Sequence, residues 1–227
     1  VGPAQRRQDT DGHDARLPGM AHGFYEGVID GRSTLGHDGG MPNFITRLLL
    51  LPERDIGLFV SYNSAGGALA QKTLARAFVE RYAPGDPPAP SDYEPSRAER
   101  RRATGTYLTT RRVETGPAKV ALLIQSLTVE EEEGRLHVTS LMQPPTILEP
   151  VEAGLWRNVE TGAPWATDVR DGRPMLYAGE VPVMAFEGAR WHQRPGLDYV
   201  VLGASLLLLL SELVLAPFGW VLHRRLG

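Results

Sequence analysis

The stretch from Gly23 to Asn63 places the strongest constraint on the fold of this chain. It contains short apolar, β-prone runs that glycine and aspartate turns separate. Such a pattern is typical of an antiparallel meander, in which each strand pairs with the next. At its centre lies Gly36-His37-Asp38-Gly39-Gly40, where a titratable ring is followed by two residues that leave the main chain bare. This arrangement suits a site where an oxyanion lies close to backbone N–H groups.

Composition limits the classes of function. The 227 residues are enough for one or two small domains, and 42% apolar residues can form a packed core. A net charge of −3 argues against nucleic acid as the main partner. Because the chain has no cysteine, it has neither a disulfide framework nor a cysteine-liganded metal site. It begins at Val1 without a signal-peptide pattern, and we expect a fragment or a processed product.

The C-terminal segment is the most apolar part of the sequence. Residues Tyr199 to Leu222 include five consecutive leucines, and Glu212 is the ionisable residue among them. As a helix this segment would span about 36 Å, against a hydrocarbon core of about 30 Å. It therefore predicts a transmembrane helix, and Arg224 and Arg225 favour a cytoplasmic C-terminal end. We expect the protein in the cell membrane with its folded part extracytoplasmic. A buried core helix is the alternative.

Proline, glycine and charge patterns divide the chain into four parts. We predict a sheet-and-helix unit, a proline-rich linker that ends in a short basic helix, a small antiparallel β-domain, and the membrane helix with its cytoplasmic end. Their boundaries are 1–83, 84–103, 104–195 and 196–227. The predicted fold class is α+β.

Two local predictions can be tested directly. A helix is expected over 65–82, with Asn63 or Ser64 as its N-cap. The helical period places four apolar residues on one of its faces, namely Ala70, Leu74, Ala77 and Phe78. In the β-domain, the acidic run 130–133 and Gly134 predict a hairpin tip between two strands.

The strands around His37 resemble a known active-site motif. The order Gly-Phe-x-x-Gly, a turn, His37-x-Gly39 and two apolar strands is similar to the last motif of the serine β-lactamase and penicillin-binding-protein superfamily. It is closest to class C-like serine hydrolases, in which His-x-Gly replaces Lys-Thr-Gly. The match covers residues 17–83. The second half, through Thr106-Tyr107 and 182–187, looks like the C-terminal extension of membrane-anchored members.

The resemblance assigns roles to three residues. It implies that His37 faces the substrate cleft and orients the nucleophile and the substrate. It implies that the N–H of Gly40, after the His37–Gly39 triplet, completes an oxyanion hole. We therefore take His37, Gly39 and Gly40 as the candidate catalytic residues. The alternative is a surface hairpin histidine with turn glycines.

The nucleophile of that superfamily is missing from this chain. No serine begins a Ser-x-x-Lys sequence, in which lysine would activate the hydroxyl. Tyr62-Asn63-Ser64 matches the middle motif in letters only, because it follows His37 instead of preceding it. Hydrolysis by these residues alone is not expected. For the complete protein the resemblance implies acyl transfer from an ester, an amide or a D-amino-acid peptide. The alternative is a non-catalytic, membrane-tethered binding module.

No metal or cofactor is expected. The segment Asp9–Asp14 is similar to a calcium loop but lacks the glycine and glutamate that an EF-hand needs at its sixth and twelfth positions. The histidines show no paired ligand spacing. The arginines at 97 and 100–102 form either a solvated helix face or a contact with anionic lipid headgroups. The expected partners are a small-molecule or peptide substrate and membrane lipid, and not nucleic acid.

Overall fold

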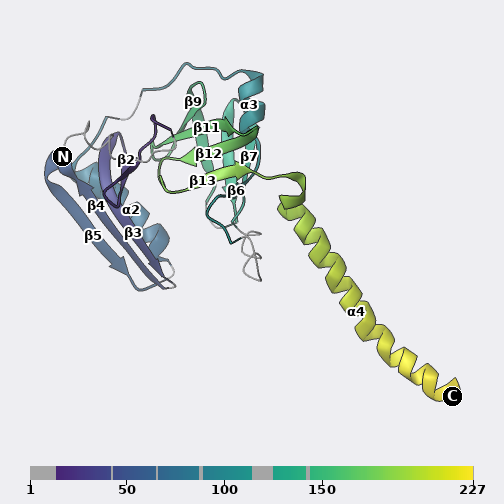
Figure 1. The fold of residues 1–227 in the computed structure, drawn as a ribbon. Helices are drawn as coiled ribbons and strands as arrows, with labels where there is room; N and C mark the ends of the chain where they lie inside the picture. Colours follow the sequence, from purple (N-terminus) through teal and green to yellow (C-terminus); the bar gives the residue numbers. More distant parts are fainter. Residues whose placement is uncertain are drawn as a thin grey trace.

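The computed structural model describes residues 14–41, 43–64, 66–86, 89–113, 125–141 and 144–226. The chain forms an open five-stranded sheet, then a closed eight-stranded barrel, and ends in a long helix (Figure 1). The sheet with its helix lies on one side of the barrel, and the terminal helix leaves from the other side.

The sheet is the meander that the sequence predicts. Its strands are β1 (Met20–Ala21), β2 (Phe24–Ile29), β3 (Arg32–Met41), β4 (Phe44–Leu51) and β5 (Ile56–Tyr62), which lie in chain order and pair antiparallel. Asp30 and Gly31 have φ values of 47° and 76°, as a type I′ turn between β2 and β3 requires. The short 3-10 helix η1 (Pro52–Arg54) joins β4 to β5.

Helix α2 (Gly67–Tyr82) covers one face of this sheet. Leu49 and Leu51 of β4 pack with Ala75, Val79 and Ala83 in its core. The helix is confirmed, and Phe78 of the predicted face packs against this core, but Leu74 is 39% exposed and the predicted cap is wrong. The buried residues of α2 are Gly67, Gln71, Ala75 and Val79. This series lies one position C-terminal to the predicted one.

Small residues explain this shift of the helix face. A Cβ atom on Gly67 would lie 2.5 Å from the Cβ atom of Tyr62, so only glycine permits this close approach. Gly66 is the N-cap and has no side-chain cap; the main-chain oxygen of Ser64 accepts a 3.1 Å hydrogen bond from Gly67 instead. Close contact between helix and sheet therefore outweighs the apolar pattern.

The barrel closes through strands distant in sequence. Its strands are β6 (Gly105–Thr109), β7 (Leu127–Glu132), β8 (Arg135–Ser140), β9 (Thr146–Glu152), β10 (Leu155–Asn158), β11 (Pro164–Arg170), β12 (Arg173–Ala178) and β13 (Ala185–Gly188). Neighbours in sequence pair, and β13 pairs with β6 through Phe186 and Thr109 to close the ring. Between β7 and β8, Glu133 and Gly134 form the predicted hairpin tip with φ values of 51° and 81°.

Alternate residues of the barrel strands face inward and outward. The interior is filled by large side chains that include Tyr107, Leu136, Leu148 and Trp156, all at most 2% exposed. Burial raises the pKa of Tyr107, whose hydroxyl donates to the carbonyl oxygen of Ala103 at 2.9 Å. The interior of the barrel is therefore a packed core of side chains.

The predicted α+β class is wrong, because most of the regular structure is β and the barrel dominates it. Several barrel strands are only four or five residues long, which gives them a weak alternating pattern in the sequence. Helices are α2, α3 (Arg97–Ala103) and α4 (Pro195–Leu226), with the 3-10 helix η3 (Trp191–Gln193) before α4.

The predicted transmembrane helix is also not supported. In the part of the chain that the structure describes, no helix combines the length and apolar character that a membrane crossing needs.

A short strap, residues 14–17, joins the sheet to the barrel wall. Arg16 donates to both Asp14 carboxylate oxygens and, through Nη1, to Glu152 Oε1 and the Ala153 carbonyl oxygen at 3.0 and 2.9 Å. Leu17 packs against outward-facing barrel residues that include Met175 and Tyr177. The side-chain hydrogen bonds from Arg16 hold the pKa of Asp14 below its usual value. The strap thus buries part of the outer wall of the barrel.

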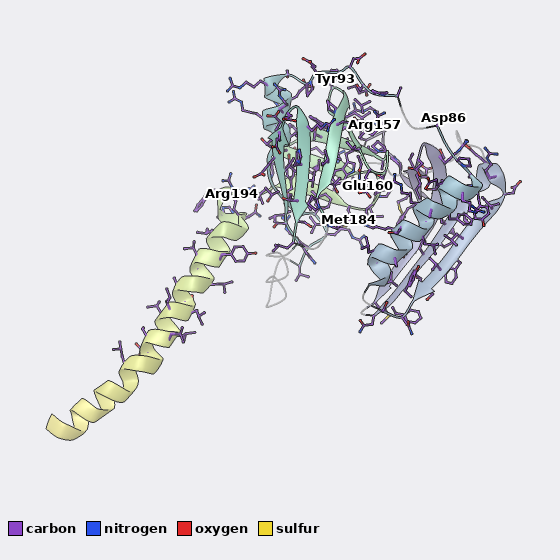
Figure 2. The ribbon with its side chains drawn as sticks, turned by 180° about the vertical axis from the view of Figure 1, so that it is seen from behind. Asp86, Tyr93, Arg157, Glu160, Met184 and Arg194 are labelled. Carbon is purple, nitrogen blue, oxygen red and sulfur yellow. The ribbon has the colours of Figure 1, made fainter. Side chains whose placement is uncertain are left out.

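Further contacts link the two β assemblies. Glu160 lies on the side of the barrel that faces α2 (Figure 2), and its Oε1 is 3.6 Å from Nη1 of Arg76. The connection after α2 is held by Arg32, which donates to the Pro84 carbonyl oxygen, and by Arg157, which donates to that of Ala89 at 2.8 Å. Pro84 is therefore held at the sheet and Ala89 at the barrel.

Candidate functional site

His37 lies on the sheet face that α2 does not cover. It pairs with Leu48 on β4, and Leu48 pairs with Phe59 on β5, which gives one row across three strands. The neighbouring row contains Leu49, which packs under α2, so alternation places His37 on the other face. The imidazole is exposed and stacks on the Tyr25 ring, with centroids 5.0 Å apart and planes 19° apart. His37 is therefore accessible and held on one side by an aromatic ring.

One edge of β3 is open beside His37. The pairing of β2 with β3 ends at Tyr25 and Gly36, whereas the pairing of β3 with β4 continues to Met41 and Phe44. Among the described residues, β3 from His37 to Met41 therefore has a strand neighbour on the β4 side alone. Alternate main-chain N–H and C=O groups along this edge are free to pair with an extended ligand.

The two glycines after His37 have different surroundings. A Cβ atom on Gly39 would lie 2.4 Å from the Thr46 hydroxyl oxygen, whereas one on Gly40 would meet only the Ile45 Cδ1 at 3.9 Å. Neither glycine has a positive φ. Gly39 is therefore required by packing against Thr46, and Gly40 leaves the strand surface open.

Asp38 has a structural partner. The Arg47 Nε and Nη2 atoms donate to its two carboxylate oxygens at 2.8 and 2.7 Å, a bidentate pair between β3 and β4. Residues 38 and 47 are register partners in the same row, so the pair fixes the alignment of the strands next to His37. Sequence reasoning did not single out this pair.

Among the residues that the structure describes, His37 contacts an aromatic ring and not a nucleophile. Within the described ranges, no hydrogen bond joins His37 to a serine, and its assigned contact is the ring of Tyr25. The Tyr62-Asn63-Ser64 letters lie at the end of β5, where Tyr62 packs under the first turn of α2. That placement fits helix packing and not catalysis.

The residues that the structure describes form no metal centre. No group of three or more histidine, aspartate or glutamate side chains among them could hold an ion. Of the calcium-like segment Asp9–Asp14, all but Asp14 lies outside the described residues, and Asp14 pairs with Arg16.

Comparison with known proteins gives distant likeness only. No family model and no curated protein matches the chain. Among solved structures, SurE with D-Leu and SurE alone each have a TM-score of 0.37 and 20% identity, over 75% of this chain and 39% and 37% of theirs. An octameric penicillin-binding protein homologue from Pyrococcus abyssi has a TM-score of 0.29 and 15% identity, over 81% of this chain and 41% of that one. The chain thus spans about two fifths of the length of each of these proteins, and a penicillin-binding protein homologue is a distant structural neighbour.

Proposed function

We propose that this chain supplies the histidine strand and the oxyanion-binding edge of a serine hydrolase that resembles penicillin-binding proteins. The observation that carries the proposal is the open edge of β3, which runs from an exposed His37 through Gly39 and Gly40. An extended acyl substrate placed along this edge would lie beside both the imidazole and free backbone N–H groups.

In this proposal the attacking serine comes from sequence outside these 227 residues. Its Oγ bonds to the substrate carbonyl carbon, its proton passes to a base, and the amine or alcohol leaves with a proton. The imidazole of His37 donates a hydrogen bond to the substrate carbonyl or carboxylate. The N–H of Gly40 stabilises the oxyanion of the tetrahedral intermediate. The substrate class is an ester, an amide or a D-amino-acid peptide.

The test is covalent labelling of the complete gene product with a fluorophosphonate probe. We expect labelling of the complete protein and no labelling of the 227-residue chain alone. His37→Ala should reduce the labelling rate about 100-fold, as the loss of one stabilising donor does. His37→Lys should retain more of the rate, because lysine can donate from the same position.

His192→Ala is the matched control, since His192 lies in η3 on the barrel side and packs against Trp191. Equal loss of labelling in His37→Ala and His192→Ala would overturn the role of His37. A complete protein that is folded and never labels would favour the second candidate, a non-catalytic module that binds an extended peptide at the same β3 edge. This candidate is supported by the free edge of β3 and by the exposed side chains of Met41, Phe44 and Phe59 beside it.

We further propose that α4 contacts a membrane surface. Its aliphatic side chains are exposed, with Leu206 to Leu210 between 49% and 69% accessible, and Trp191 at its foot is 74% exposed. Arg190 and Arg194 flank η3, Arg194 lies at the start of α4 (Figure 2), and cations there complement anionic headgroups. Co-sedimentation should be stronger with vesicles containing phosphatidylglycerol than with pure phosphatidylcholine. Failure to sediment with either would contradict the proposal and leave the hydrolase test unaffected.

A further inference from the structure

A charged groove lies between α3 and the β7–β8 hairpin, on the barrel side away from the sheet (Figure 1). Its volume is about 1160 Å³. That volume is above the usual range of small-molecule sites, about 300–1,000 Å³, so the groove can hold several residues of a peptide. No part of the β3 edge lines it, and the inference below does not depend on the hydrolase proposal.

One wall of the groove is cationic. Arg97, Arg100 and Arg101 of α3 all line it, and positions 97 and 101 are one helical turn apart on the same face. Arg100 is 3.9 Å from Glu131. Arg97 and Arg101 are exposed, and neither guanidinium group has an ion-pair partner among the described residues. Two unpaired guanidinium groups at this spacing can approach one carboxylate together.

The opposite wall is acidic. It contains Glu130, Glu131 and Glu132 of β7, with His137 of β8. The Glu131 carboxylate accepts from the Gly134 N–H at 3.0 Å and approaches Arg100, so it is already satisfied. Glu132 has a loose contact of 3.8 Å with His137, and Glu130 has no ion-pair partner in the described part of the chain. Glu130 is therefore free to accept hydrogen bonds from an ammonium group, and Glu132 can add to them because its contact with His137 is long.

We infer that this groove binds a zwitterionic oligopeptide, with its carboxylate at Arg97 and Arg101 and its ammonium group at Glu130 and Glu132. The two walls exclude the simpler ligands. A polyanion would be attracted by the arginines but repelled by the glutamates, and a polycation would be repelled by the arginines. A ligand with one charge of each sign complements both walls.

The test is titration calorimetry at low salt with a tetra-alanine peptide that has free termini. The comparison ligands are the N-acetylated and the C-amidated forms of the same peptide. We expect the free peptide to bind, and each blocked end to weaken binding about fivefold, as for partly exposed ion pairs.

Two double variants assign the ends of the peptide. In R97Q/R101Q, binding should be about fivefold weaker and C-terminal amidation should have no further effect. In E130Q/E132Q, binding should also be about fivefold weaker, and N-acetylation should have no further effect. The matched control is E53Q/R54Q in η1, which removes one charge of each sign outside the groove and should change neither affinity nor the effect of blocking.

Three outcomes would overturn the inference. The first is absence of peptide binding to the folded full chain. The second is an unchanged effect of amidation in R97Q/R101Q or of acetylation in E130Q/E132Q, which would place the peptide elsewhere. The third is tighter binding of inorganic phosphate or heparin than of peptide, which would identify an anion site.

Discussion

The sheet and the barrel use the same antiparallel pairing but differ in how their surfaces are covered. Every barrel strand has two neighbours, and the interior is closed around Trp156 at 2% exposure. In the sheet, the face opposite α2 leaves Met41, Phe44 and Phe59 exposed by 72%, 55% and 67%, and β3 has an open edge. The barrel is thus complete within the described residues, whereas the sheet offers a face and an edge for recognition.

The largest expected loss of stability comes from a substitution in the core of the barrel. Trp156→Ala removes a buried side chain whose Nε1 donates to the Thr167 hydroxyl at 3.3 Å, and should reduce the free energy of unfolding by about 3–5 kcal/mol. Phe59→Ala, in the exposed face of the sheet, is the control and should change it by less than about 0.5 kcal/mol. Urea titration followed by circular dichroism measures both. Equal losses would mean that the sheet face is buried in solution.

The next effect concerns the charge cluster at one side of the barrel. Glu187 pairs with Arg112 at 2.6 Å and also with Arg173, and its side chain is 14% exposed. Glu187→Gln leaves two guanidinium groups without their shared anion and should reduce the free energy of unfolding by about 2 kcal/mol, less than for a fully buried pair. Glu53→Gln in η1 is the exposed control. A loss no greater than that of the control would show that solvent replaces the carboxylate.

A smaller effect separates packing from chemistry at the candidate site. Gly39→Ala places a methyl group against the Thr46 hydroxyl and should reduce the free energy of unfolding by about 1 kcal/mol. Adding Thr46→Ala should restore that stability, because it removes the clash. If the double variant regains stability, Gly39 serves packing. If Thr46→Ala gives no rescue, the clash is not the cause.

The smallest effect tests the strap with pH. The pKa of Asp14 is lowered in the folded state, so its stabilising contribution is present above its unfolded pKa, near 4, and is lost as pH falls through the folded value. Solvent screening keeps this contribution below about 1 kcal/mol. Asp14→Asn should destabilise the protein slightly at pH 7 and flatten the decline in acid. If the free energy of unfolding of Asp14→Asn followed the same course between pH 7 and pH 2 as that of the unsubstituted protein, Asp14 would not stabilise the strap.

Sequence reasoning located the strands of the sheet because their turns and alternation are local. It placed His37 on a strand, and the structure agrees. The open edge beside His37 was not predicted, because it depends on where the pairing of β2 with β3 ends. The predicted face of α2 differs from the observed one by one position, because a hydrophobic pattern does not reveal the close contact of Gly67 with Tyr62.

Closure of the barrel and the charged groove could not be predicted for a common reason. Both depend on pairs that are distant in sequence: Phe186 with Thr109 in the barrel, and the arginines of α3 with the glutamates of β7 in the groove. Composition gives the signs of the charges but not which of them face one another. The arginine cluster was therefore interpreted from its own helix alone.

The strap at residues 14–17 has a mechanical consequence. A pulling force on the N-terminal side of Asp14 reaches the barrel wall through Arg16 and Leu17 before it reaches β1. The strands that carry His37 are thereby shielded from tension along the chain. In a single-molecule extension experiment, release of the strap should precede any loss of the β3–β4 register.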